Sequence, residues 1–325
     1  MNSKKMMTMA AGCAVALSAT RLFAAVPGYA TLIAHRGESV DAPENTLPAY
    51  RTAVDRGFGF ECDIYLTKDG RVFTFHDRSL ARTTGGANTN KCGDVTWGEV
   101  SALDVGSWGR WKDSRFAGTR PALLEEVLEL ARDGRWIYVE VKTGPEIVPF
   151  VKKVLAAQSR ATPQNTLFIS FSEDSCRELK RVMPEFRVYW LTSALQKDEG
   201  GGRFAITPEY VVSKCRELGV DGVDAQYVPE IVTAGFIKAV HDAGFGFHAW
   251  TVDDLADTVT VFSRGAETVT TNCAKKQLDA WRLAERMVYG EGKDKWAPST
   301  SGWKNGIMLP MDARRTKGRI KPCVE

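Results

Sequence analysis

The chain has 325 residues, of which 44% are hydrophobic and 26% are charged, and its formal net charge is +3. This length suits one large barrel or two ordinary domains, and the composition is that of a globular protein. Lys4, Lys5 and Arg21 are the only charged residues before residue 25 and equal the whole net excess. The rest of the chain is therefore balanced, which argues against nucleic acid or an anionic membrane surface as a partner.

The first 24 residues have the layout of a secretory signal peptide. Lys4 and Lys5 precede the short apolar run MMTMAAGCAVALSAT, and Ala24-Ala25 offers small residues for cleavage. Arg21 interrupts the run too soon for a stable membrane span. We expect export, to a periplasm or outside the cell. Lipid anchoring at Cys13 is the alternative, although most of the apolar run follows that cysteine.

Eight β-rich apolar runs alternate along the rest of the chain with stretches of helical periodicity. The runs are 31–37, 58–66, 136–143, 166–171, 186–193, 220–227, 244–252 and 266–272. The helical stretches are 46–57, 125–134, 146–158, 173–183, 208–219, 229–244, 253–265 and 275–287, and several end at a glycine. This alternation predicts a closed parallel (β/α)₈ TIM barrel. An open doubly wound sheet is the alternative, but no GxGxxG or Walker pattern follows a strand.

Two segments do not fit a plain barrel. Residues 78–120 are rich in Gly, Asn, Thr and Trp, and an insertion this long in a compact domain is usually functional. Residues 286–325 form a polar tail whose role the sequence does not indicate. The expected organisation is a signal peptide over 1–24, a barrel over 25–285 and a C-terminal extension over 286–325.

The cysteines do not form a metal or redox motif. Cys13 would leave with the signal peptide, and the remaining six are scattered without a CxxC pair. We expect Cys62, Cys176 and Cys215 to be small buried thiols rather than disulfide partners.

Acidic residues lie in two of the predicted strands, near the ends where a barrel of this kind carries its reactive groups. Glu61 and Asp63 are two residues apart and share one face, and so do Glu140 and Lys142. Two carboxylates that face a barrel interior repel each other unless a cation lies between them. Glu61, Asp63 and Glu140 are hard oxygen ligands, which suit one Mg²⁺ or Ca²⁺ better than Zn²⁺.

Two histidines end strand-like runs. His35 follows the first run, and His76 ends VFTFH after the turn at residues 68–70. They suit a general acid and a general base beside such an ion. Arg36 and Lys142 add positive charge for an anionic centre such as phosphate. The combination predicts metal-assisted cleavage of a phosphodiester.

These motifs together resemble the glycerophosphodiester phosphodiesterase family. AHRG, APENT, ECD, TKDG, FHD, VEVKT, HAWTVDD and TTN occur in the family's order between residues 31 and 285. Their joint occurrence is specific, whereas any one alone is weak. The resemblance implies a TIM barrel with a metal at its strand ends, which hydrolyses glycerophosphodiesters to an alcohol and glycerol 3-phosphate. It also implies that residues 78–120 form the family's cap, inserted after the second strand.

Carried over by motif, the resemblance gives each of these residues a role. His35 and His76 match the acid–base pair, and the metal ligands are Glu61, Asp63 and Glu140. Arg36 matches a phosphate contact, Lys142 a charge partner beside metal and substrate, and Trp250 a residue lining the site. The chain departs from the family at Gly59-Phe60, where an acidic or polar residue is common.

Several residues keep two interpretations. Asn45 is either a helix N-cap or a hydrogen-bond partner near the metal. Trp250 either lines the site or fills the core. His248 is expected to be packed in the core, and His241 is expected on the solvent side of a helix.

Three functions stay open from the sequence: a glycerophosphodiesterase, a related phospholipase C or D type enzyme acting on intact lipid, and a non-catalytic ligand-binding barrel. The lipid enzyme needs an apolar rim, which Trp97, Trp108 and Trp111 of the insertion offer unless they form its own small core. The sequence does not choose between Mg²⁺ and Ca²⁺, between alcohols, or between a cyclic phosphate and direct attack by water. Nor does it indicate the oligomeric state.

Overall fold

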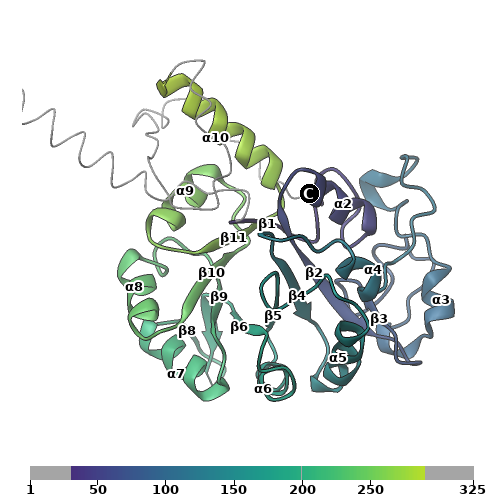
Figure 1. Ribbon diagram of the computed structural model, residues 1–325, viewed down its shortest axis with the longest axis horizontal. Coiled ribbons are helices and arrows are strands. Elements are labelled where there is room, and N and C mark those ends of the chain that lie inside the picture. Colours follow the sequence, from purple (N-terminus) through teal and green to yellow (C-terminus); the bar gives the residue numbers. More distant parts are fainter. Residues whose placement is uncertain (1–30, 199, 290–325) are drawn as a thin grey trace, which may run out of the picture.

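The computed structural model describes residues 31–198 and 200–289, and Figure 1 shows a barrel surrounded by helices. Eight parallel strands form it: β1 (Leu32–Ala34), β2 (Gly59–Leu66), β4 (Ile137–Val141), β5 (Thr166–Ser170), β6 (Arg187–Thr192), β9 (Gly222–Gln226), β10 (Gly246–Trp250) and β11 (Thr268–Thr271). Each pairs with the next, and β11 pairs with β1 to close the ring. The predicted (β/α)₈ barrel is confirmed.

The helices between these strands are α2 (Leu47–Asp55), α4 (Leu124–Leu128), α5 (Val148–Ala156), α6 (Glu173–Val182), α7 (Pro208–Leu218), α8 (Ala234–Asp242), α9 (Leu255–Ser263) and α10 (Ala274–Tyr289). The main core lies between them and the outer face of the barrel. In β2, Phe60, Cys62 and Ile64 pack outward into this core, so that alternation turns Glu61 and Asp63 inward.

Two helices are shorter than the sequence pattern predicts. Thr233 caps α8 by accepting a hydrogen bond from the backbone of Phe236, so the helix begins at Ala234 rather than near 229. At the end of α4, beyond Glu129, the backbone amides donate to carbonyls three residues earlier instead of four, as Ala131 N does to Leu128 O. This tightening ends the helix at Leu128 rather than near 134.

The inserted segment is an ordered layer beside β2. Strand β3 (Val72–Thr74) pairs antiparallel with β2, and α3 (Trp97–Ser101) follows a short 3₁₀ helix at Cys92–Asp94. A separate apolar cluster joins the insertion to the barrel and comprises Tyr65, Phe73, Phe75, Leu80, Cys92, Val95, Val100, Val105 and Leu123. Trp97 packs against this cluster. The interpretation of Trp97 as part of a small core is therefore confirmed.

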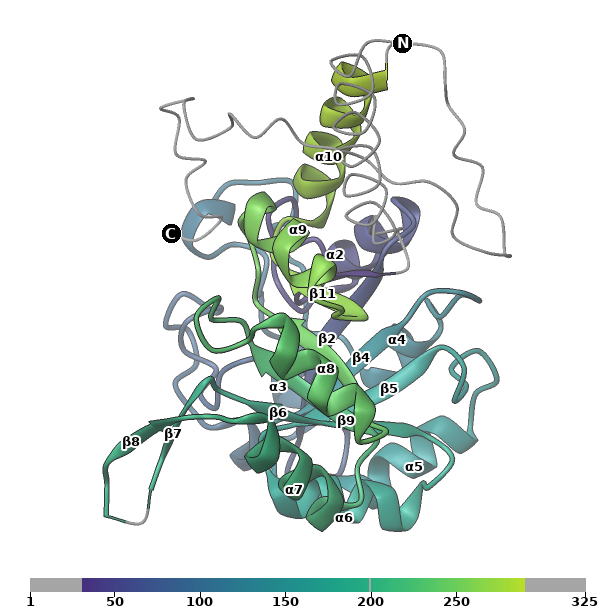
Figure 2. The ribbon, with the colours of Figure 1, turned by 90° about the vertical axis from the view of Figure 1, so that its left-hand side faces the viewer.

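A hairpin of β7 (Leu195–Lys197) and β8 (Arg203–Ala205) projects after β6, as Figure 2 shows. The hairpin is not predictable from the sequence, because both strands are only three residues long and their residues are mostly exposed. Neither strand carries the apolar alternation that marks a half-buried strand.

The predicted signal peptide and most of the predicted C-terminal extension lie outside the described residues, so export stays a prediction. Helix α10 runs to Tyr289, past the expected boundary at 285. Cys62, Cys176 and Cys215 are buried free thiols, as predicted. Across the described residues, no helix combines the length and apolarity needed to cross a bilayer.

Candidate active site

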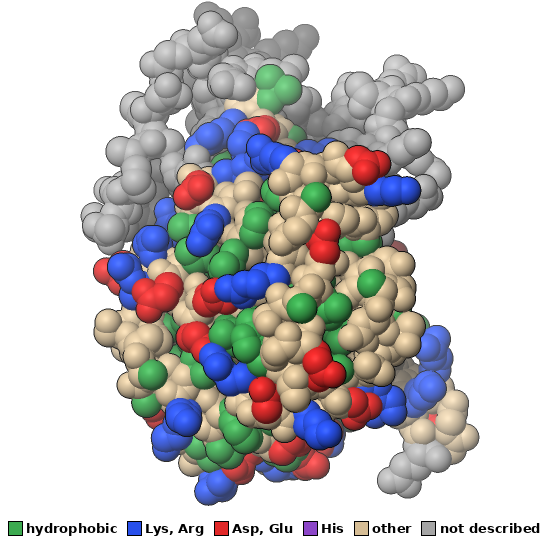
Figure 3. All heavy atoms as spheres, turned by 90° about the vertical axis from the view of Figure 1, so that its right-hand side faces the viewer, with side chains coloured by type: hydrophobic (Ala, Val, Ile, Leu, Met, Phe, Trp, Pro, Cys, Tyr) green, Lys and Arg blue, Asp and Glu red, His purple; other side chains and the backbone are tan. Residues whose placement is uncertain are grey.

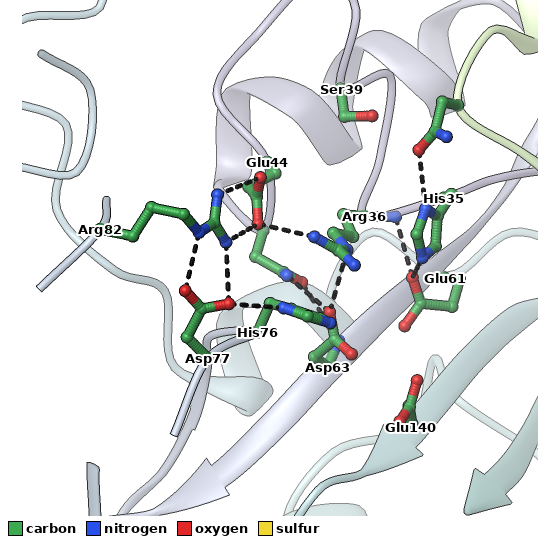
Figure 4. A network of polar contacts seen from close by, with 12 residues as sticks. His35, Arg36, Ser39, Glu44, Glu61, Asp63, His76, Asp77, Arg82 and Glu140 are labelled. Atoms are coloured by element: carbon green, nitrogen blue, oxygen red, sulfur yellow. Dashed lines mark hydrogen bonds and ion pairs between the residues drawn. The ribbon is translucent and has the colours of Figure 1, made fainter. Parts of the chain in front are cut away.

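Three buried carboxylates meet inside the barrel on two neighbouring strands. Glu61 and Asp63 come from β2 and Glu140 from β4, and the register pairs Asp63 with Glu140. One oxygen of each lies within 4.8 Å of the others (Figure 4). The structure thus brings together the three residues that the sequence analysis assigned to a metal.

The ionisation of Glu61, Asp63 and Glu140 indicates which kind of ligand this triad would bind. Burial and the neighbouring carboxylates of Asp63 and Glu140 raise the pKa of Glu61 well above its usual range. Burial and Asp63 raise the pKa of Glu140 to about 7. Among the described residues Glu61 Oε1 is buried without a hydrogen-bond partner. A hard divalent cation would satisfy that oxygen and remove the repulsion, so the donor set fits Mg²⁺ or Ca²⁺.

Two cations flank the triad. Lys142 Nζ lies 2.8 Å from Glu140 Oε1 and 3.3 Å from Asp63 Oδ1. Arg36 Nε lies 3.5 Å from Asp63 Oδ2. Burial opposes ionisation of Asp63, but Arg36 and Lys142 outweigh it and hold the Asp63 pKa well below its usual range. Asp63 is therefore the anionic member of the triad, next to positive charge that can also face a phosphate.

The loop that carries Arg36 is shaped by its backbone. Arg36 has a φ of 57° and its amide donates to Glu61 Oε2 at 2.9 Å. Gly37 follows with a φ of 79°, and a Cβ there would lie 2.6 Å from the Ala49 carbonyl carbon. Only glycine fits this turn against α2, which explains the glycine of the HRG motif.

His35 is held by hydrogen bonds from the segments that follow β10 and β11, where β11 closes the barrel against β1. Its Nδ1 lies 2.7 Å from Asn272 Oδ1, and Asn272 Nδ2 donates to Asp253 Oδ2. Because the Asn272 amide donates to Asp253, its oxygen faces His35, and His35 Nδ1 must carry the proton. His35 Nε2 is left as an acceptor, 3.9 Å from Glu61 Oε2. Burial and Arg36 lower the pKa of His35 to about 4.

His76 follows β3 and is held in a similar way. Its Nδ1 lies 2.6 Å from Asp77 Oδ1, and its ring points toward Asp63 (Figure 4). Hydrogen bonds from Arg82 and His76 overcome burial and lower the pKa of Asp77 to about 2. An ionised Asp77 only accepts, so His76 also carries its proton on Nδ1 and presents Nε2. Both histidines thus offer Nε2 beside the triad.

Asn45 contacts a predicted metal ligand and does not cap the helix. Its Nδ2 donates to Asp63 Oδ2 at 2.8 Å, while its Oδ1 accepts from Asp63 N and from the Tyr50 hydroxyl. The N-cap of α2 is Thr46 instead. Asn45 has a φ of 55°, which asparagine adopts more readily than most residues.

Replacing Asn45 by alanine is expected to lower the free energy of unfolding by about 1–3 kcal/mol, because buried groups of Asp63 and Tyr50 lose their partner. Urea denaturation of the chelator-treated protein measures this. The control is Asn90→Ala at an exposed position of the insertion, with an expected change within about 0.5 kcal/mol. Equal effects of the two substitutions would contradict the proposed role of Asn45 in holding Asp63.

The remaining aromatic and histidine predictions have mixed outcomes. Trp250 ends β10, half-buried, with its Nε1 donating to Asp224 O and its ring edge-on to the exposed Phe171. His248 is buried and stacks on Tyr189 at 3.9 Å, which confirms a packed core residue. The prediction for His241 is wrong: it is half-buried, and its Nε2 is enclosed.

Several residues that hold the predicted site residues, directly or through one further side chain, were not identified from the sequence. They are Glu44, Arg82, Asp253 and Asn272. Glu44, Asp253 and Asn272 lie within the quoted APENT, HAWTVDD and TTN motifs, which could have indicated them. The contacts of Arg82 are recognisable only once the insertion is placed in space.

A sequence model of the glycerophosphoryl diester phosphodiesterase family matches residues 35–276 and so covers the whole site. The chain belongs to this family. Its members are hydrolases, which confirms the predicted class of enzyme. The motif resemblance is likewise confirmed.

Related proteins agree with this membership. A glycerophosphodiester phosphodiesterase of Caldanaerobacter subterraneus subsp. tengcongensis is 28% identical over 246 residues, covering 74% of this chain and 93% of the relative. One from Bacillus subtilis is 27% identical over 260 residues, covering 76% and 84%.

Solved structures of the family share the fold. A phosphodiesterase of Oleispira antarctica, in complex with the product sn-glycerol-3-phosphate, superposes with a TM-score of 0.66 at 24% identity, covering 78% of this chain and 96% of the other. A glycerophosphodiester phosphodiesterase of Thermotoga maritima superposes with a TM-score of 0.59 at 22% identity, covering 78% and 100%.

Proposed function

We propose that the protein hydrolyses glycerophosphodiesters to an alcohol and glycerol 3-phosphate. One observation carries this proposal: two neutral histidines, each tied at Nδ1, present Nε2 beside three buried carboxylates whose oxygens lie within 4.8 Å of one another. Family membership and the glycerol 3-phosphate bound to the Oleispira antarctica relative support the choice of substrate.

Glu61, Asp63 and Glu140 would hold one Mg²⁺ or Ca²⁺. When bound, the ion polarises the phosphoryl group and neutralises charge on its non-bridging oxygens. Arg36 and Lys142 would face the same phosphate, because both already lie beside Asp63. Their positive charge favours the extra negative charge that builds up as the P–O bond breaks.

His35 and His76 would move the protons. One Nε2 accepts the proton of the attacking group, which is water or the glycerol 2-hydroxyl, and the other donates a proton to the leaving oxygen. Where the 2-hydroxyl attacks, water must open the resulting cyclic phosphate in a second step to give glycerol 3-phosphate. Burial lowers the pKa of both histidines, so both are neutral at pH 7 and suited to accept. The negative phosphate raises the pKa of the ring that faces the leaving group, which lets that ring arrive protonated.

Chelator-stripped enzyme is expected to release no glycerol 3-phosphate from glycerophosphocholine, glycerophosphoethanolamine, glycerophosphoglycerol or glycerophosphoinositol. Adding Mg²⁺ or Ca²⁺ should restore release from at least one of them, because the triad needs its cation to bind an anionic phosphate. Full turnover in excess chelator, with no metal detected by mass spectrometry, would contradict metal dependence. No release with either ion would contradict the proposed substrate class.

A phospholipase acting on intact lipid is the second candidate, favoured by Phe171. This side chain is 46% exposed and packs against Trp250 at the strand-end side of the barrel, which gives an apolar rim. Adding phosphatidylcholine and lysophosphatidylcholine vesicles to the panel decides between the two. Figure 3 shows acidic and basic side chains intermixed on the face that carries the insertion, so no field of one sign there favours an anionic membrane.

A further inference from the structure

Arg82 lies in the insertion, yet its guanidinium reaches two acidic residues that border the site. Its Nη1 and Nη2 donate to the two oxygens of Glu44 at 2.9 and 2.7 Å. Its Nε and Nη2 donate to the two oxygens of Asp77 at 2.7 and 3.0 Å. Two bidentate contacts use four of the five N–H donors of one arginine, in a planar arrangement that no lysine can reproduce.

These contacts continue on both sides into the groups that would act on the substrate. On one side, Glu44 Oε1 accepts from Arg36 Nη1 at 3.0 Å. On the other side, Asp77 Oδ1 holds His76 Nδ1 at 2.6 Å. One chain of polar contacts therefore runs Arg36–Glu44–Arg82–Asp77–His76 (Figure 4), and the first four members alternate in charge. Arg82 is its central link and touches neither the triad nor His35 in any contact found for the described residues.

The insertion holds Arg82 from behind. Its guanidinium carbon lies 5.0 Å from the centre of the Trp108 ring, a cation–π contact from a distant part of the same insertion. Leu80, two residues before Arg82, is fully buried in the insertion's apolar cluster. Arg110 of the insertion also donates to the backbone oxygen of Ser39, in the loop that carries Arg36. The insertion is thus fastened to this loop at two points.

We infer that Arg82 is a positioning residue, through which the insertion orients His76 and Arg36 for the reaction. The inference rests on the proposed function and assigns Arg82 no contact with the substrate. By fixing both oxygens of Asp77, Arg82 leaves Asp77 one orientation, in which it accepts from His76 Nδ1 and keeps His76 Nε2 free. By fixing Glu44, Arg82 also holds the carboxylate that accepts a hydrogen bond from Arg36 Nη1.

The test compares Arg82→Gln and Arg82→Lys with the control Arg120→Gln. Arg120 lies in the same insertion, is similarly exposed (42% of its side chain against 38% for Arg82), and makes a bidentate pair with Glu126 away from the site. We expect Arg82→Gln to lower kcat by about tenfold to 100-fold, part of the ~10²–10⁴ that a placed acid or base contributes. Arg120→Gln should stay within about twofold.

Two readouts separate positioning from a structural role. In a His76→Ala background, Arg82→Gln should lower kcat by clearly less than it does in the wild type, because only the link to Arg36 through Glu44 remains to be lost. Long-range ¹H–¹⁵N spectra of the metal-free protein report the His76 tautomer without substrate, and the chain has only four histidines to assign. The Nδ1–H form should dominate in wild type and in Arg120→Gln and should lose population in Arg82→Gln.

An equal loss of kcat with and without His76, together with an unchanged His76 tautomer, would overturn the inference. If Arg82→Gln does not melt cooperatively, the same two readouts on Arg82→Lys decide. Wild-type enzyme that releases no glycerol 3-phosphate would contradict the proposed function instead, and the tautomer measurement would still test the link from Arg82 to His76.

Discussion

Replacing His35 or His76 by alanine is expected to lower kcat by about 10²–10⁴ while folding and metal binding survive. The reason is geometric: each ring is fixed at Nδ1, by Asn272 or by Asp77, and each presents Nε2 to the triad. Steady-state release of glycerol 3-phosphate measures the loss, and calorimetric titration of Ca²⁺ shows that the ion still binds. The double variant should be little slower than either single one, because the two act as a unit.

The control for both is His241→Ala, since His241 lies on α8 away from the site. Its kcat should remain within about twofold of wild type. A substrate with a more acidic leaving group should partly rescue whichever variant lacks the acid, and only that one. Near-normal kcat in both single variants would refute the assignment of these two histidines to proton transfer.

Neutralising the triad is expected to weaken divalent-ion binding by well over tenfold in both Asp63→Asn and Glu61→Gln. The two substitutions should change the free energy of unfolding of the metal-free protein in opposite directions. At pH 7 Asp63→Asn should lower the free energy of unfolding, because the ionised Asp63 is stabilised by Arg36 and Lys142. Glu61→Gln should raise it, because burial and neighbouring carboxylates disfavour an ionised Glu61.

The pH dependence follows from the same shifts. The pKa of Glu61 is raised in the folded state, so the free energy of unfolding of the metal-free protein falls as the pH rises above about 4.5. Glu61→Gln should remove this fall, because glutamine does not ionise. Asp63 has a depressed pKa, so its contribution is present above about 3.8 and is lost only in stronger acid. Urea denaturation in chelator from pH 3 to 8 covers both pH ranges. Two variants with the same sign at pH 7 would contradict the charge assignment.

The barrel and the triad were predictable from the sequence because both follow from local rules. Strand alternation turns Glu61 and Asp63 to one face, and strand order then places Glu140 on a neighbouring strand. The glycine of the HRG motif follows from a turn that admits no side chain against Ala49.

The contacts that orient the site were not predictable in this way. Arg82 meets Glu44 across 38 residues, and Asn272 meets His35 across 237. Such pairs depend on how the insertion folds back on the β1–α2 loop and on where β11 closes against β1, which no local pattern fixes. Asn45 shows the same limit: its position before α2 suggested a cap, but Thr46 fills that role and leaves Asn45 for Asp63.

The most direct test of the proposed reaction is a crystal structure with Mn²⁺, as an anomalous scatterer, and glycerol 3-phosphate. We predict one anomalous peak coordinated by oxygens of Glu61, Asp63 and Glu140, with the phosphate against that ion and Arg36 and within hydrogen-bond reach of Nε2 of His35 or His76. An ion held elsewhere, or a phosphate bound away from both histidines, would contradict metal-assisted phosphodiester hydrolysis at this site.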